Sequence, residues 1–204
     1  MILKSTLLNC FSAVLIGTFG TSCYLFDFDR DKSAVSSDIQ FLAGVGSSTT
    51  DTATDGDPNF TGDLDESDTT ITLGVSTEVN EHVGFNLKYI DFGNVEFDGM
   101  FAGGTSIGSV QRSGVELSAT GRYPLGANFS ATGTVGILMW DGTENETFAG
   151  APLSTSDSGF DPLFGIGIEN AITPNITTGL SYTRYLDVFD DNVDAIVFEV
   201  SYGL

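Results

Sequence analysis

The chain has 204 residues and a formal net charge of −21, with 28 Asp and Glu against 7 Lys and Arg, yet 41% of it is hydrophobic. The 16 Phe and 6 Tyr exclude a disordered acidic tail, and the length suits one domain. The shortage of cations excludes direct binding to nucleic acid phosphates, which requires clustered Lys and Arg.

The first 22 residues have the pattern of a secretory signal peptide. Lys4 supplies a positive start, residues 7–19 are mostly apolar, and Gly20 begins a small-residue cleavage site. This apolar run is too short to span a bilayer. The sequence therefore predicts export, with a signal peptide at 1–22, a lead-in segment at 23–37 and one domain at 38–204.

Cysteine usage excludes a disulfide framework. Cys10 leaves with the signal peptide, so only Cys23 remains after cleavage. A thiol directly after the cleavage site can carry lipid, but such sites usually have Leu three residues earlier, where this chain has Gly20. We therefore favour an incidental cysteine over a lipidated one.

From Asp38 to Leu204, apolar and polar residues alternate with period 2, which is the pattern of strands with two unlike faces. Ile71, Leu73 and Val75, for example, alternate with Thr72, Gly74 and Ser76. We expect eight strands, around 38–48, 71–76, 83–89, 115–123, 129–139, 164–169, 176–182 and 196–204. No helical period of comparable length occurs.

Short and long connections between these strands alternate along the chain. The short ones, at 80–82, 124–127 and 173–175, have turn residues. The long ones, at 49–68, 91–109, 141–161 and 187–194, hold 19 of the 28 acidic residues and no Lys or Arg. In an up-and-down antiparallel sheet, all the tight turns lie at one end and all the acidic loops at the other.

The polar face of the strands decides which side meets water. A soluble lipocalin-like barrel needs a charged outer surface, commonly about 25–35% charged. Here the polar face is mostly Gly, Ser and Thr, which suit a crowded interior. We also expect aromatic girdles at both strand ends, formed by Phe85, Tyr123, Phe129 and Tyr202 near the turns and by Phe92, Trp140, Phe160 and Tyr185 near the loops. Period 2, however, places some of these residues, such as Trp140, on the lumen side. These features favour a membrane barrel over a soluble ligand-binding one.

The hairpins at 74–93, 114–137 and 165–187 each combine strand, tight turn and strand, and they resemble the small eight-stranded outer-membrane barrels of Gram-negative bacteria, the OmpA/OmpX-like and opacity-protein-like families. The resemblance implies an all-β, antiparallel up-and-down transmembrane barrel with short periplasmic turns and long acidic extracellular loops. It also implies an integral outer-membrane location, contact with lipid and lipopolysaccharide, a monomeric state, and recognition of the C-terminal strand by the assembly machinery. One departure is Leu204, where such barrels usually end in Phe.

Period 2 places seven charged residues on the lumen face: Glu78, Lys88, Arg112, Glu116, Arg122, Glu169 and Glu199. Strand register brings Lys88 near Glu116 at mid-depth, with Glu199 at a similar height, and it places Glu78, Arg122 and Glu169 nearer the tight turns. These charges could form exchangeable salt bridges that gate a narrow ion path. We favour a static polar plug, because an eight-stranded barrel has little room for a pore.

The first acidic loop raises the possibility of a weak Ca²⁺ site, because carboxylate oxygens are the ligands that Ca²⁺ prefers. Its candidate ligands are Asp51, Asp55, Asp57, Asp63 and Asp65. Their spacing differs from that of an EF-hand loop, so simple solvation of an exposed loop is the favoured interpretation. Beyond this loosely bound Ca²⁺, no cofactor is expected.

Catalysis is not expected. Some outer-membrane barrels modify lipid A with a His and a Ser or carboxylate partner, but the only histidine here is His82, in a predicted periplasmic turn. The sequence therefore favours a non-enzymatic outer-membrane protein with a structural or surface-interaction role. The alternatives are a narrow ion channel, a divalent-cation-binding surface protein and, less favoured, a soluble lipocalin-like barrel.

Overall fold

The computed structural model describes residues 39–51, 60–65, 67–101, 104–126, 128–189 and 191–204, all within one compact unit, Val35–Leu204. Over these residues the regular structure is β-strand: β1 Ile39–Asp51, β2 Phe60–Asp65, β3 Ser67–Asn80, β4 Val83–Phe101, β5 Gly104–Pro124, β6 Phe129–Phe148, β7 Ala151–Thr173, β8 Ile176–Val188 and β9 Asp191–Gly203. Among the described residues, no helix has the length and apolar character needed to cross a membrane.

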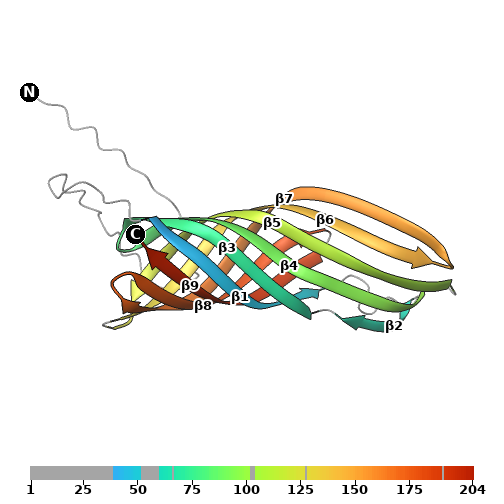
Figure 1. Cartoon of the computed structure of the whole chain (residues 1–204), viewed down its shortest axis with the longest axis horizontal. Helices are drawn as coiled ribbons and strands as arrows, with labels where there is room; N and C mark the ends of the chain where they lie inside the picture. The colour runs from blue at the N-terminus through green and yellow to red at the C-terminus, as the bar shows by residue number, and fades with distance from the viewer. Residues whose placement is uncertain (1–38, 52–59, 66, 102–103, 127, 190) are drawn as a thin grey trace, which may run out of the picture. The chain divides into compact units, whose positions relative to one another are not determined.

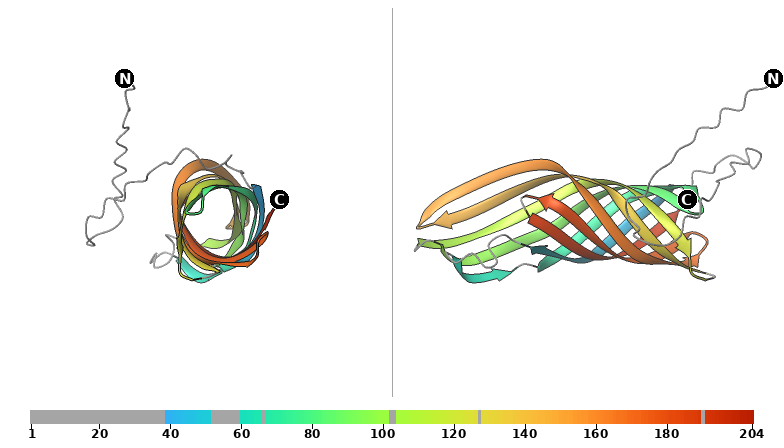
Figure 2. Two further views of the ribbon diagram at one scale, coloured as in Figure 1. Left: turned by 90° about the vertical axis from the view of Figure 1, so that its left-hand side faces the viewer. Right: turned by 180° about the vertical axis from the view of Figure 1, so that it is seen from behind.

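Eight of these strands close a barrel (Figures 1 and 2). Around the ring the order is β4, β3, β1, β9, β8, β7, β6 and β5, and β5 pairs with β4 to close it. Every pair is antiparallel. The short strand β2 lies outside the ring and pairs with the end of β4. The structure thus confirms the predicted eight-stranded up-and-down barrel, with one additional strand in the first long connection.

The short connections lie where the sequence predicted them. The backbone N–H of His82 donates to Asn80 Oδ1 at 2.8 Å in the β3–β4 turn. In the β7–β8 turn, the backbone N–H of Ile176 donates to Thr173 Oγ1 at 3.0 Å. Side-chain oxygens of this kind satisfy backbone donors that the ladder leaves open at a turn.

Three of the long connections differ from the prediction. The one expected at 187–194 is short, because β8 ends at Val188 and β9 begins at Asp191. Strands β4 and β5 are so long that only residues 102–103 lie between them in the sequence. Strands β6 and β7 are joined by Ala149 and Gly150, which both have a positive φ angle. The loops expected at 91–109 and 141–161 are therefore mostly continuous ladder, in which Glu144 pairs with Thr155. The period-2 signal fades there because both faces of a strand in water can be polar. We call the described residues of 91–109, in β4 and β5, and of 141–161, in β6 and β7, the outer extension.

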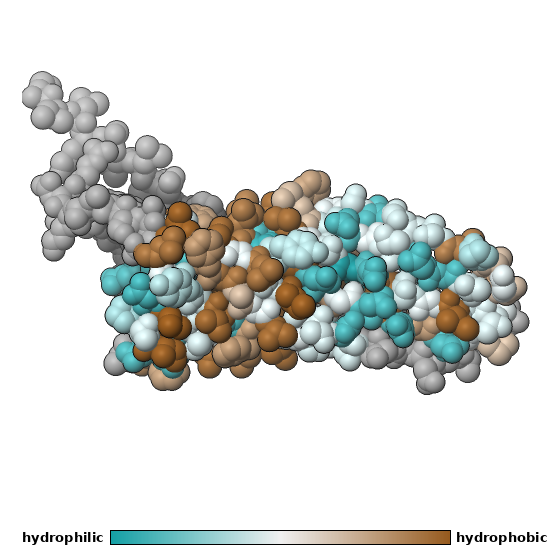
Figure 3. Space-filling model, in the orientation of Figure 1, coloured by the Kyte–Doolittle hydropathy of each residue, from teal (hydrophilic) through white to brown (hydrophobic). Residues whose placement is uncertain are grey.

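An apolar belt surrounds the barrel near its tight turns. It is formed by exposed side chains that point outward from every barrel strand, including Phe41, Val45, Ile71, Leu73, Leu87, Leu117, Val135, Ile137, Phe164, Ile166, Leu180, Ile196 and Phe198. Figure 3 shows brown apolar residues concentrated over this half of the face in view, whereas the outer extension is mainly pale and teal. Such a belt is the surface that a barrel presents to lipid.

A second group of apolar side chains fills the inside of the barrel at the outer edge of the belt. This apolar layer comprises Ile90, Phe92, Leu138, Trp140, Leu163, Tyr185, Val188, Val193, Ala195 and Val197, with Phe189 packed against it. It corrects the predicted outer aromatic girdle, because Phe92, Trp140 and Tyr185 are buried inside the barrel. Phe160 does point outward, and so do the four aromatic residues expected near the turns.

Candidate functional site

A layer of charged residues crosses the middle of the lumen. Lys88 pairs in register with Glu116 on the next strand, and its Nζ lies 3.2 Å from Glu116 Oε1 and 3.8 Å from Glu199 Oε2. Ser118 Oγ donates to Glu116 Oε1 at 2.6 Å, and Tyr185 OH donates to Oε2 at 3.0 Å. Glu116 is 1% exposed, so its charge depends on these donors and on Lys88.

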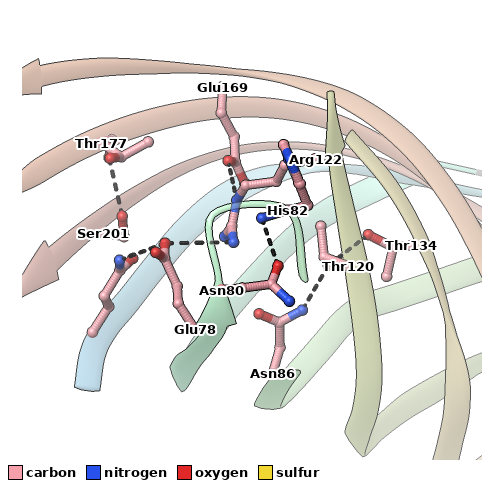
Figure 4. A network of polar contacts seen from close by, with 11 residues as sticks. Glu78, Asn80, His82, Asn86, Thr120, Arg122, Thr134, Glu169, Thr177 and Ser201 are labelled. Atoms are coloured by element: carbon pink, nitrogen blue, oxygen red, sulfur yellow. Dashed lines mark hydrogen bonds and ion pairs between the residues drawn. The ribbon is translucent and has the colours of Figure 1, made fainter. Parts of the chain in front are cut away.

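A second charged group lies nearer the tight turns (Figure 4). Arg122 Nε donates to Glu169 Oε2 at 2.7 Å, and its Nη1 lies 3.4 Å from Glu78 Oε1. Gln40 Nε2 donates to the same Glu78 oxygen at 3.0 Å. A Cβ on Gly84 would come within 3.0 Å of Arg122 Nη1, so glycine leaves the space through which the guanidinium reaches across the lumen. The group therefore joins four strands.

A third charged group holds the short β8–β9 connection over the outer end of the apolar layer. Arg112 Nη2 donates to Asp191 Oδ2 at 2.5 Å, and Nη1 donates to Thr50 Oγ1 at 2.9 Å. The guanidinium carbon lies 6.0 Å from the ring centroid of Phe189, and that ring packs edge-on against Trp140 at 6.0 Å. Phe189 therefore covers the apolar layer from the outside.

Between the central layer and the tight turns, the lumen contains a polar cavity of about 70 Å³. Its walls carry hydroxyl, amide and charged side chains, including Gln40, Ser76, Glu78, Asn86, Lys88, Thr120, Arg122, Thr132, Thr134, Glu169, Thr177, Ser181, Glu199 and Ser201. By the usual volume per buried water, it has room for roughly five water molecules. We call this space the inner cavity.

All seven lumen charges named from the sequence point into the barrel, but they form three separate groups. Lys88, Glu116 and Glu199 make the central layer, while Glu78, Arg122 and Glu169 make the inner group. Arg112 stands apart at the outer mouth. This grouping follows the depths expected from strand register, with Lys88, Glu116 and Glu199 at mid-depth and Glu78, Arg122 and Glu169 nearer the tight turns.

Sequence reasoning missed Asp191 and the apolar layer as a whole. It assigned Tyr185 to the outer girdle, although period 2 did place Trp140 on the lumen side. Part of the apolar layer could be predicted from the sequence. Lys88 faces the lumen, and every second residue after it faces the same way, which includes Ile90 and Phe92. The same extrapolation from Thr134 and Gly136 leads to Leu138 and Trp140. No comparable signal identified Asp191, because its contact with Arg112 joins residues 79 positions apart.

Two further predictions concern metal binding and catalysis. The side chains proposed for Ca²⁺, those of Asp51, Asp55, Asp57, Asp63 and Asp65, lie outside the described residues, as do 1–38 with the predicted signal peptide. Within the part that is described, no group of three or more His, Cys, Asp or Glu side chains could hold a metal ion. His82 is a half-exposed turn residue, with Nε2 at 3.6 Å from Glu81 Oε1.

The chain is similar to known outer-membrane proteins. The family described as "OmpA-like transmembrane domain" matches residues 36–202. Outer membrane protein A of Salmonella typhi is 32% identical over 116 residues, 56% of this chain and 32% of that protein. The same protein of Shigella flexneri is 31% identical over 116 residues, with the same coverage. The matched segment thus spans about a third of the length of these relatives.

A solved structure shows the same fold. The attachment invasion locus protein Ail of Yersinia pestis superimposes with a TM-score of 0.54, covering 82% of this chain and 99% of that one. The two sequences are 17% identical, so this likeness concerns the fold alone.

Proposed function

The chain belongs to the family of OmpA-like transmembrane domains and is an integral outer-membrane β-barrel, and we propose that its role there is structural and surface-directed, without catalysis. In this proposal the lumen is closed to ions and the outer extension is presented to the medium. The barrel contacts outer-membrane lipid and lipopolysaccharide as a monomer.

The apolar layer carries the proposal of a closed lumen. Its side chains are buried, and Ile90, Leu138 and Val193 have no exposed area. An ion passing this level would lose its water without gaining polar partners, which is strongly unfavourable. Beneath it, Lys88 and Glu116 form an ion pair of 3.2 Å in the lumen, and the interior of an eight-stranded barrel is small.

Planar bilayer recordings test the closed lumen. We expect neither the wild-type protein nor Glu116→Ala to conduct, because removing this carboxylate leaves the apolar layer in place. Discrete conductance steps in the wild-type protein that change in Glu116→Ala would support the alternative, a narrow channel gated by lumen salt bridges. Refolding of both proteins is verified by heat-modifiable migration on a gel before recording.

The outer extension supports the surface role. Its residues include Glu96, Asp98, Glu144, Glu146 and Asp157, and its described part contains no Lys or Arg. Arg112, three residues beyond it on β5, points into the barrel mouth. Strand β7 pairs with β8 only from Leu163 onward, so residues 151–162 form a sheet edge paired on one side. An acidic sheet that stands clear of the lipid belt is suited to contacts outside the cell.

Epitope accessibility on intact cells tests this orientation. A tag inserted between Ala149 and Gly150, at the tip of the β6–β7 hairpin, should bind antibody without permeabilisation. The matched control is the same tag between Leu125 and Gly126, in a tight turn, which should bind only after the outer membrane is opened. The reverse pattern would contradict the proposed orientation.

The proposal also covers processing and assembly, through the predicted signal peptide at 1–22 and the last barrel strand, β9. We expect removal of residues 1–22 on export, measured as the mass of the mature protein, and recognition of β9 by the assembly machinery. Leu204→Phe should speed membrane insertion in a pulse-chase assay, because it adds an aromatic residue two positions after Tyr202, at the end of the last barrel strand. Equal insertion rates would argue against recognition through residue 204.

A further inference from the structure

Strand β7 has an open edge in the outer extension. It pairs with β6 from Ala151 onward, but with β8 only from Leu163 onward, because β8 ends at Val188. In Figures 1 and 2 the orange β7 lies at the margin of the extension. Residues 151–158 are all exposed, and no described strand pairs with residues 151–162 on the side away from β6.

The direction of the backbone groups at this edge follows from the register with β6. Ala171 N–H donates to Asn128 C=O at 2.9 Å, and no register shift interrupts the β6–β7 ladder. In an antiparallel pair, residues that bond the partner strand alternate with residues that do not. The odd-numbered residues of β7 therefore bond β6. The even-numbered residues of 152–162 direct their N–H and C=O groups to the open edge.

Two prolines and one side-chain bond agree with this assignment. Pro152 and Pro162 have even numbers, and proline occurs in strands where its missing N–H faces away from the ladder. Ser158 N–H donates to Asp157 Oδ1 at 2.8 Å, as expected of a donor outside the β6 ladder. The other donors directed to the edge are the N–H groups of Ser154, Ser156 and Phe160.

The length of the edge suits one short strand. Residues 153–161 lie between the two prolines and span about 27 Å, at about 3.4 Å per residue. An extended peptide can add to such an edge through main-chain hydrogen bonds, and side chains on the two faces then select its sequence. The prolines end this ladder on both sides, so the edge takes a segment of limited length.

The two faces of the edge differ in charge. On the outward face, the hydroxyls of Ser154 and Ser156 form hydrogen bonds of 3.0 and 3.1 Å with side chains of β6. The opposite face has the carboxylates of Asp157 and of Glu144 and Glu146 on β6. A partner strand with Lys or Arg on this face compensates their charge. A second copy of β7 would bring further carboxylates to it, which is unfavourable.

We propose that residues 153–161 bind one basic, extended peptide segment of an extracellular partner, which adds to the outer extension as a further strand. The inference rests on the proposed surface role of the extension, because the partner reaches the edge from outside the cell. Lys or Arg side chains at alternate positions of the segment face Asp157 and Glu144. The main chain of the segment bonds the N–H groups of Ser154 and Ser156.

Amide hydrogen exchange tests for the added strand. The full chain, labelled with ¹⁵N and refolded in micelles of an uncharged detergent, is titrated with a blocked peptide of about seven alternating Lys and Val residues. We expect saturable protection of the Ser154, Ser156 and Phe160 N–H groups, whereas that of Thr155, directed to β6, stays unchanged. The same peptide with Glu in place of Lys should give no protection. Shift changes without protection, or protection along β2 instead, would overturn the proposal.

A proline variant localises the binding. Ser156→Pro removes an N–H from the middle of the edge and leaves the β6 ladder intact, because that N–H points away from β6. The peptide should then bind at least about tenfold more weakly. The matched control, Ser156→Ala, loses the same hydroxyl but keeps the N–H, and should bind as the wild type does. Equal binding by both variants would contradict strand addition, and the wild-type protection pattern remains decisive if Ser156→Pro does not fold.

This experiment is independent of the orientation of the barrel in the membrane. Micelles leave both ends of the barrel accessible to the peptide, so a lack of protection there would overturn strand addition even if the tag at 149–150 is accessible on cells. The reversed tag pattern would contradict the proposed surface role instead, whatever the peptide does in micelles.

Discussion

The two halves of the lumen are lined by the same strands but differ in chemistry. Toward the tight turns, the inward positions carry hydroxyls, amides and charges around the inner cavity. Toward the outer mouth, the inward positions of the same strands carry the apolar layer. The next inward residue after Lys88 is Ile90, and the next after Gly136 is Leu138. One half is built to hold water and the other to exclude it.

This difference shows that a barrel interior can change character along its depth. The change occurs at the central layer, where Tyr185 belongs to the apolar layer through its ring and to the charged layer through its hydroxyl. Phe92 packs edge-on against that ring at 4.9 Å. Variants on either side of this boundary should therefore have unequal effects, which separates the two halves by experiment.

Glu116→Ala should have the largest effect, because Glu116 lies at the boundary itself. Its loss leaves Lys88 without its closest carboxylate and Tyr185 OH without its acceptor. Breaking a buried pair on one side costs about 3–5 kcal/mol, measured as the free energy of unfolding by urea in lipid vesicles. The double variant Lys88→Met/Glu116→Leu should recover much of this loss. If it does not, packing around Glu116 is responsible rather than the charge.

Leu138→Ala compares the two halves directly. Leu138 is fully buried in the apolar layer, and truncation of such residues costs about 2–5 kcal/mol. Thr134, four residues earlier on the same face, lines the inner cavity and exchanges a hydrogen bond of 3.0 Å with Thr120. Thr134→Ala should cost less than about 1 kcal/mol, because water can replace that bond. Equal costs would show that the lumen is uniform.

Gly142→Ala tests whether Phe189 covers the apolar layer. A Cβ at residue 142 would lie 2.6 Å from Phe189 Cδ2, so the ring must move away from Trp140. Overpacking of this kind costs about 1–3 kcal/mol. Trp140 is the only tryptophan of the chain, so its fluorescence should shift to longer wavelength as water reaches it. An unshifted spectrum in the folded variant would mean that Phe189 does not shield Trp140.

The smallest effect concerns pH and the outer extension. Burial, followed by repulsion from Glu146, raises the pKa of Glu144 above its usual value. The folded extension therefore binds this proton more tightly than the unfolded chain, so its stability increases as pH falls through the raised pKa. The amide of Val110, paired with Glu144, should exchange with solvent faster at pH 7 than at pH 5 after correction for intrinsic rates.

Glu144→Gln should slow Val110 exchange at pH 7 and remove most of this pH dependence. Asp157→Asn, which neutralises an exposed carboxylate on β7, is the matched control and should retain the dependence. A pH profile that is unchanged in Glu144→Gln would assign the effect to other carboxylates of the extension.

The strands and turns of the barrel were predictable from the sequence, because their signals are local. Lipid on one side and a crowded lumen on the other impose period 2 on residues such as Val83 to Tyr89. The length of β6 and β7 was not predictable, because residues of the outer extension such as Glu144 and Thr155 are polar and face water. Polar and apolar residues therefore do not alternate there. The ladder of β6 and β7 rests on pairing between chain segments, which is not local.

The sequence by itself determined the number of barrel strands, the separation of apolar belt from acidic end and the inward phase of seven charged residues. Strand register also placed Lys88 near Glu116, whereas the contacts between strands that are not neighbours were decided only by the tertiary structure, because they depend on the tilt and register of all the strands together. The tertiary structure placed Tyr185 against Glu116, Arg122 between Glu78 and Glu169, and Arg112 on Asp191. It also showed that the inward face becomes apolar above the central layer, where side chains such as Ile90 and Leu138 are fully buried.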